Sequence, residues 1–155
     1  MDNISVEKIN YEISQIDKQF ISCKSLLDLC KLKELDLIET MAAGSFIHSF
    51  YNGVEKTLVH IFKGINEMLP NDTNWHTKLL EKAFSNTETR DSILNKEYKE
   101  TLNSYMRFRH LFRHTYEYKL KIEKLKPLVD NSTDLWNKIK HDINNFIRKQ
   151  IDKNI

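Results

Sequence analysis

Hydrophobic residues recur three and four positions apart along most of this chain, which is the spacing of one face of an α-helix. The first such run comprises Val6, Ile9, Ile13, Ile16, Phe20, Cys23, Leu27 and Cys30. A second run extends from about residue 37 to residue 69, where Pro70-Asn71-Asp72 should end it. We expect these two helices to pack as an antiparallel hairpin, with Ser5 as the N-cap of the first.

Three more helices are expected in the second half of the chain. Asn74-Trp75-His76 begins a short helix that continues through Phe84, and the polar residues 85–91 form a loop. A fourth helix runs from about residue 93 to 118, and Asp130-Asn131-Ser132 offers caps for a last helix after Pro127. The pattern predicts an all-α bundle of four main helices plus a short fifth.

Composition supports this class and indicates one domain over residues 1–155. The chain has 3 glycines and 2 prolines, which leaves few positions for tight turns. No glycine-rich phosphate loop is present, so the nucleotide sites of P-loop and Rossmann proteins are excluded. Cys23 and Cys30 fit helical packing better than zinc binding, and on a straight helix they lie too far apart for a disulfide. We expect Trp75 and Trp136 to anchor the core.

Charge and hydropathy bear on two possible binding partners, nucleic acid and membrane. The net charge of +2 means that nucleic-acid binding requires a local cluster of basic residues. The N-terminus has no apolar leader, and no segment approaches the roughly 20 apolar residues that span a bilayer. We therefore expect a cytoplasmic protein that makes no membrane contact.

The candidate chemistry lies in residues 105–116, where arginines and histidines alternate with aromatic residues. At 100° per residue, one helix face carries Leu102, Tyr105, Arg109, Phe112 and Tyr116, and this face should be buried or interfacial. A buried guanidinium costs several kcal/mol unless a carboxylate or phosphate meets it. Arg109 therefore has either a structural partner, for which Glu55 is a candidate, or a place in a cleft that receives an anion.

Arg107, His110 and His114 lie together on an adjacent helix face. Cleavage of RNA without a metal needs a base, an acid and a cation for the phosphate, and histidine and arginine supply these functions. Arg109 and His114 differ by roughly 140° on an ideal helix. They can act on one phosphate only if the helix bends or ends near His114, or if two helices pair across a dimer axis. The alternative is an ordinary solvated basic face.

The spacing Arg109-x4-His114-x-Tyr116 resembles the R-x(4–6)-H-x-Y signature of the HepT-like HEPN ribonucleases. Four surrounding segments also resemble this family and occur in the same order, over roughly residues 41 to 140. They are residues 50–56, residues 74–80, Arg107-Phe108-Arg109-His110, and residues 125–129 followed by Trp136.

The resemblance implies a HEPN-type homodimer that acts, without metal or other cofactor, as the endoribonuclease toxin of a toxin–antitoxin pair. It places His114 in acid/base chemistry and Arg109 on the scissile phosphate. It also implies a minimal nucleotidyltransferase (MntA-like) antitoxin that transfers AMP to Tyr116. Glu117 replaces the glycine that commonly follows this tyrosine, and thus places a negative charge beside the site.

Other interpretations of the same residues remain open. Arg107, His110 and Arg113 are candidate RNA contacts or solvated side chains. Lys119 to Lys126 could guide an RNA backbone electrostatically or form an ordinary wet surface. The whole chain could instead be a non-catalytic HEPN module that binds a nucleotide or a protein partner, or a helical scaffold whose first helix recruits a partner.

Overall fold

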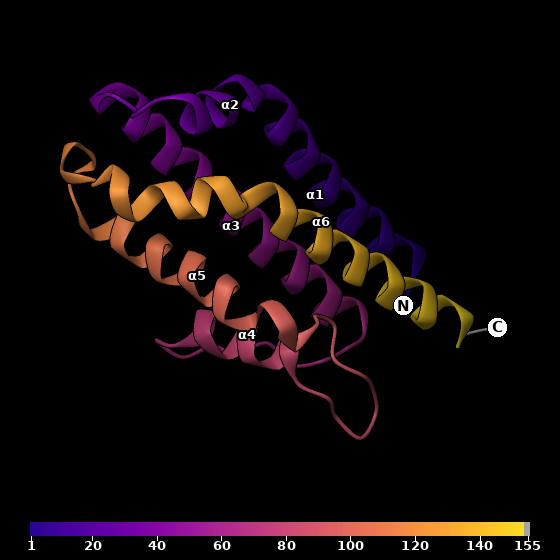
Figure 1. Ribbon diagram of the computed structural model, residues 1–155. Helices are drawn as coiled ribbons and strands as arrows, with labels where there is room; N and C mark the ends of the chain where they lie inside the picture. The colour runs from indigo at the N-terminus through magenta and orange to yellow at the C-terminus, as the bar shows by residue number, and fades with distance from the viewer. Residues whose placement is uncertain (154–155) are drawn as a thin grey trace.

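In the computed structural model, residues 1–153 are described, with every side chain except that of Ile4. They form six α-helices, two 3₁₀ helices and no strand, so the predicted all-α class is confirmed. The elements are α1 (Asn3–Ser22), α2 (Lys24–Leu32), α3 (Leu37–Gly64), α4 (Trp75–Phe84), η1 (Lys96–Tyr98), α5 (Lys99–His114), η2 (Glu117–Lys119) and α6 (Ile122–Asp152). The four long helices α1, α3, α5 and α6 form the bundle, and α4 covers one side of it (Figure 1).

The predicted hairpin of the first two long helices is confirmed, because α1 and α3 run antiparallel in close contact. A Cβ atom added at Gly53 would lie 2.7 Å from Cγ1 of Ile16, so a missing side chain lets the two helices approach. One turn further along, the Gln19 side-chain amide donates a hydrogen bond to the carbonyl oxygen of Phe46 at 3.1 Å. These contacts make α3 the buried centre of the molecule.

Helix α6 closes the bundle by packing along both α1 and α3, with its length running past α5 (Figure 1). Trp136 is 2% exposed and packs edge-to-face against Phe50 of α3. Its indole nitrogen donates a hydrogen bond to Oδ1 of Asp17 in α1 at 2.7 Å. The prediction that Trp136 is a core anchor is confirmed, whereas Trp75 is only half-buried.

The start of the first predicted helix differs from the expectation. Asp2, not Ser5, is the N-cap, because its carboxylate accepts a hydrogen bond from the backbone N–H of Ser5 at 2.7 Å. The helix also breaks at Cys23, so the predicted single helix is divided into α1 and α2. The break turns α2 toward α6, where the Lys126 ammonium donates to the carbonyl oxygen of Cys30.

Two predicted helix ends are wrong because local contacts stop the helix earlier. Helix α3 ends at Gly64, and Asn66 adopts a left-handed backbone conformation with φ of 58°, which reverses the chain before Pro70. Met68 is therefore exposed instead of lying on a helix face. Helix α5 ends at His114, with Thr115 as an extended C-cap, rather than continuing to residue 118.

The predicted start of the last helix is also wrong. Helix α6 begins at Ile122 and runs through Pro127, so Asp130-Asn131-Ser132 lies inside the helix and does not cap it. Proline removes one backbone hydrogen bond in the second turn and destabilises a helix interior by about 3 kcal/mol. Burial of Leu125 and Val129 on either side of Pro127 holds the helix together across this position. No helix of residues 1–153 combines the length and apolar character needed to cross a membrane.

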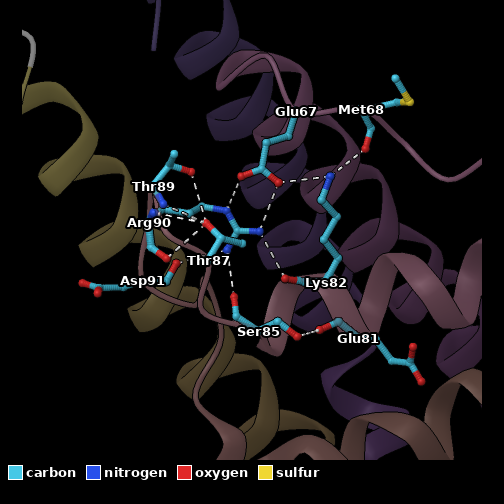
Figure 2. Close-up of polar contacts among 9 residues, drawn as sticks. All are labelled: Glu67, Met68, Glu81, Lys82, Ser85, Thr87, Thr89, Arg90 and Asp91. Atoms are coloured by element: carbon cyan, nitrogen blue, oxygen red, sulfur yellow. Dashed lines mark hydrogen bonds and ion pairs between the residues drawn. The ribbon is translucent and has the colours of Figure 1, made fainter.

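The loop after α4 is fixed by Arg90, which is 5% exposed although the sequence places it in a polar stretch. Figure 2 shows its guanidinium between Glu67 and three carbonyl groups. Nε and Nη2 donate to the two oxygens of Glu67, Nη1 donates to the carbonyls of Ser85 and Asp91, and Nη2 donates also to that of Lys82. All five N–H donors of Arg90 are thus used, which marks a structural cation that joins the ends of α3 and α4.

Candidate active site

Arg109 lies on the inner face of α5, against α3. Its Nε donates a hydrogen bond to Oδ1 of Asn52 at 2.8 Å and lies 3.3 Å from Oε1 of Glu55. The Arg109 and Glu55 side chains are 13% and 6% exposed. The expectation that Glu55 partners Arg109 is therefore confirmed, and the charge of this arginine is compensated inside the protein.

Glu55 holds a second group, His76, which sequence reasoning left without a role. Oε2 of Glu55 lies 2.7 Å from Nδ1 of His76, whose ring packs beside that of Trp75. His76 comes from α4, which is anchored by the buried Leu79 and Leu80. The carboxylate of Glu55 thus connects α3, α4 and α5 at a single point.

Arg109 and Arg90 are both largely buried, but their hydrogen bonding differs. Arg90 uses all five of its donors. Arg109 donates through Nε alone, and no hydrogen bond from its Nη1 or Nη2 reaches any of residues 1–153. The N–H groups on these two terminal nitrogens form the planar fork that binds phosphate or carboxylate oxygens. Arg109 is thus held by its inner nitrogen while its outer nitrogens stay available to an anion.

The buried Tyr51 and the half-buried His48 complete the environment of Arg109. Tyr51 is 1% exposed, and burial together with the nearby Glu55 carboxylate raises the pKa of its phenol far above the ordinary value. His48 stacks on Phe112 at 4.7 Å and contacts the Asn52 amide at 3.5 Å. Burial and then the positive charge of Arg109 lower the pKa of His48, which favours its neutral form.

These residues form a polar row on α3 that sequence analysis identified only at Glu55. His48, Asn52 and Glu55 are spaced four and three apart, so they share one face of a helix that is otherwise largely buried. That spacing was a usable signal, because polar side chains that repeat on an apolar helix need partners. His76 carried no such signal, since its position depends on the turn between α3 and α4.

His114 is the last residue of α5 and is exposed. Its ring lies 4.6 Å from that of His110, one turn earlier, which is also exposed. On a continuous straight helix, Arg109 and His114 would point in directions too different to meet one phosphate. The helix ends at His114, as one of the predicted solutions required. No hydrogen bond joins Arg109 to His114 among the described residues, so one copy of the chain brings His114 to His110 and Arg109 to Glu55.

Tyr116 does not continue the inner face of α5, because the chain leaves the helix at Thr115. Tyr116 is 71% exposed in the single chain, so it is not buried there, and the alternative expectation of an interfacial position stays a prediction. The ring stacks against Tyr118 at 6.0 Å, and the Lys119 ammonium lies 5.6 Å from the Tyr116 ring centroid. Leu102 and Tyr105 of the same predicted face are buried as expected, and Phe112 is half-buried.

The predicted RNA contacts occupy the outer surface of α5. Arg107 is exposed, and its guanidinium contacts Glu100 at 3.5 Å and the Ser104 hydroxyl at 3.2 Å. Arg113 is exposed as well. Among the side chains that the structure describes, no group of three or more His, Cys, Asp and Glu residues could hold a metal ion.

Comparison with known protein families gives a match over most of the chain. The profile of a family described as HepT-like protein matches residues 42–150. This range includes most of α3, all of α4 and α5 and nearly all of α6, and therefore every residue of the candidate site. No curated protein and no solved structure matches the chain.

Proposed function

Because this chain belongs to the family of HepT-like proteins, part of the HEPN group of toxins and ribonucleases, we propose that it is an endoribonuclease toxin. The observation that carries the proposal is the hydrogen bonding of Arg109. Glu55 and Asn52 hold its inner nitrogen, while its outer nitrogens have no protein acceptor among the described residues. This arrangement suits binding of the phosphate whose ester bond is cleaved.

In the proposed reaction, the 2′-oxygen of the ribose attacks the adjacent phosphorus atom and the bond to the 5′-oxygen of the next nucleotide breaks. A base removes the proton of the 2′-hydroxyl, and an acid returns a proton to the leaving 5′-oxygen. His114 carries one of these proton transfers, because it is exposed and an imidazole can both accept and donate a proton. The Nη groups of Arg109 neutralise charge on the phosphate oxygens, and no step requires a metal.

The proposal includes a homodimer, because one copy does not join its own Arg109 and His114. A second copy packed against the C-terminal end of α5 would bring the two α5 ends together. His110 and Arg113 are exposed at this end and would contact the RNA backbone, and Arg107 would extend these contacts along α5. The partner copy therefore completes the site in this mechanism.

We propose Tyr116 as the target of a nucleotidyltransferase antitoxin. Its hydroxyl oxygen would attack the α-phosphorus of ATP, so that a phosphodiester forms, pyrophosphate leaves and the transferase takes up the phenolic proton. The 71% exposure of Tyr116 supports access by a second enzyme. Lys119, above the Tyr116 ring, would lie near the new phosphate. The added anionic group would repel the RNA backbone close to His114.

The decisive test is cleavage of RNA by the purified chain in EDTA. We expect native protein to cleave, and both His114→Ala and Arg109→Ala to lose at least about 100-fold in rate, as for removal of a proton-transfer or charge-stabilising group. His141→Ala, at an exposed histidine of α6, is the matched control and should retain full activity. Equal cleavage by native protein and His114→Ala would overturn the proposal. The intact mass of the native sample must first show that Tyr116 is unmodified.

The separation of Arg109 from His114 favours a second candidate function, a HEPN module that binds an anionic ligand without cleaving it. In that case, unmodified native protein would bind RNA and leave it intact. Arg109→Ala would lose binding, and His114→Ala would retain it. Such a result would assign the Arg109 fork to recognition alone.

A further inference from the structure

Arg109 lines a groove of about 550 Å³, and the part of this groove beyond Asn52 and Glu55 has no role in the proposed cleavage. Its wall is built by α1, α3, α4 and α5. Besides Asn52 and Glu55, which hold Arg109, the lining residues are Glu12, Lys56, Val59, His60, Trp75 and Arg109. The volume falls within the range of small-molecule sites, roughly 300–1,000 Å³.

One side of the groove offers a stacking surface. Trp75 is half-buried and lines the groove, with Val59 as its apolar neighbour. The Trp75 ring packs against His76, whose ring is held in turn by Glu55. His76 therefore restrains the orientation of the indole. An aromatic surface fixed in this way suits a planar ligand, because bases stack on such side chains in proteins that bind single-stranded nucleic acid.

Another part of the groove offers a carboxylate acceptor. Oε1 of Glu12 lies 3.9 Å from Nε2 of His60, and the two side chains are 16% and 28% exposed. Burial lowers the pKa of His60, Glu12 raises it, and Lys63, Lys8 and Lys56 lower it further, so the net effect favours the neutral ring. Glu12 is consequently not neutralised by an imidazolium. Its oxygens can accept hydrogen bonds from N–H donors of a ligand.

Two positively charged side chains, Arg109 and Lys56, also line the groove. The outer nitrogens of Arg109 have no acceptor among the described residues, and Lys56 is exposed on the next residue after Glu55. A ligand that combines a planar ring, N–H donors and a phosphate would meet a matching group for each part. Among the common nucleobases, guanine presents two adjacent donors, N1–H and the N2 amino group, to a single carboxylate.

We propose that this groove binds one guanine nucleotide, with the base on Trp75, its N–H edge on Glu12 and its phosphate on Arg109. In the proposed ribonuclease, on which this inference rests, the groove selects the nucleotide next to the scissile phosphate. Cleavage would then occur beside guanines rather than uniformly along an RNA.

The test is a titration of the full-length protein with each of the four 5′-nucleoside monophosphates, followed by tryptophan fluorescence. We expect 5′-GMP to quench the emission and to bind at least about tenfold more tightly than 5′-AMP, 5′-CMP or 5′-UMP, which is the discrimination of a good bidentate contact. Trp75→Phe should lose the quenching, because the remaining Trp136 is buried in the core.

Glu12→Gln tests the base contact without removing bulk. It should weaken 5′-GMP binding by about tenfold and leave the other three nucleotides unaffected. Glu7→Gln, at an exposed position of the same helix, is the matched control and should bind like the native protein. Circular dichroism and thermal unfolding establish that both variants are folded.

The binding assay separates this inference from the proposed function. Specific 5′-GMP binding without RNA cleavage would support guanine binding in the groove and contradict the proposed ribonuclease activity. Three results would each overturn the guanine site without contradicting the proposed ribonuclease activity. They are RNA cleavage without quenching by nucleotides, equal affinity for the four nucleotides, and unchanged 5′-GMP binding by Glu12→Gln.

Discussion

Oε1 of Glu55 and Nε of Arg109 lie 3.3 Å apart, although one residue belongs to the central helix α3 and the other to α5. Both side chains are largely buried, so bulk water stabilises their charges less than it stabilises exposed charges. Because the second oxygen of Glu55 meets His76, the carboxylate cannot turn away from the arginine without losing another contact. The pair therefore sets the direction in which the outer nitrogens of Arg109 point.

Glu55→Gln should destabilise the protein by about 3 kcal/mol, because it leaves Arg109 as a buried charge without a counter-ion. Urea unfolding at pH 7 measures the change. Glu100→Gln is the matched control, since Glu100 pairs with Arg107 at 3.5 Å but is 83% exposed. It should alter stability by no more than about 0.5 kcal/mol. Similar losses in the two variants would contradict a special role for the buried pair.

Glu67→Gln should lower the free energy of unfolding by about 2 kcal/mol at pH 7, because Arg90 would keep its three carbonyl acceptors but lose its carboxylate. Burial opposes the charged form of Glu67, yet hydrogen bonds from Arg90 and Lys82 lower its pKa below the ordinary value. A lowered carboxyl pKa gives stability that is present above about pH 4.3 and is lost as the pH falls through the folded-state pKa.

The difference in free energy of unfolding between native protein and Glu67→Gln should therefore be largest at pH 7 and shrink as the pH falls below about 4.3. Urea unfolding at a series of pH values follows it. A difference that stays constant down to pH 3 would show that the Glu67 charge does not stabilise the fold.

His48 should make the protein less stable in mild acid. Burial and Arg109 lower the pKa of His48 in the folded state, so the unfolded chain binds the proton first. Stability should therefore fall as the pH drops below about 6.5, the ordinary histidine pKa. His48→Gln should flatten this part of the pH profile of thermal unfolding, whereas His141→Gln, at an exposed site, should not. Identical profiles for native protein and His48→Gln would contradict the assignment.

If the proposed nucleotidyltransferase antitoxin modifies the chain, Tyr116→Phe should abolish the transfer of AMP when the two proteins are produced together, because the acceptor hydroxyl is gone. Intact-mass measurement would show one added AMP on the native chain and none on the variant. Tyr118→Phe is the matched control, since Tyr118 stacks against Tyr116 and is 60% exposed. Loss of the modification only in Tyr118→Phe would move the acceptor to that residue.

The helical class and the inward position of Arg109 follow from sequence alone, because each depends on the 3.6-residue period of a single helix. The same reasoning named Glu55 as a candidate partner of Arg109, since a charge on a buried face needs a counter-ion or a bound anion, and the structure shows the Glu55 contact. The antiparallel pairing of the first two long helices was predicted because a short connection joins two helices that each have an apolar face. Periodicity also placed Trp136 in the core.

Tertiary structure decided the features that depend on contacts between distant segments. The ends of α3 and α5 and the start of α6 were set by capping geometry and packing, which allowed α6 to run through Pro127. His76 reaches Glu55 only because the chain reverses after α3, and Arg90 is buried because three carbonyl groups and Glu67 converge on it. A hydrophobic period records which face of a helix is buried, but it does not record which distant side chains meet there.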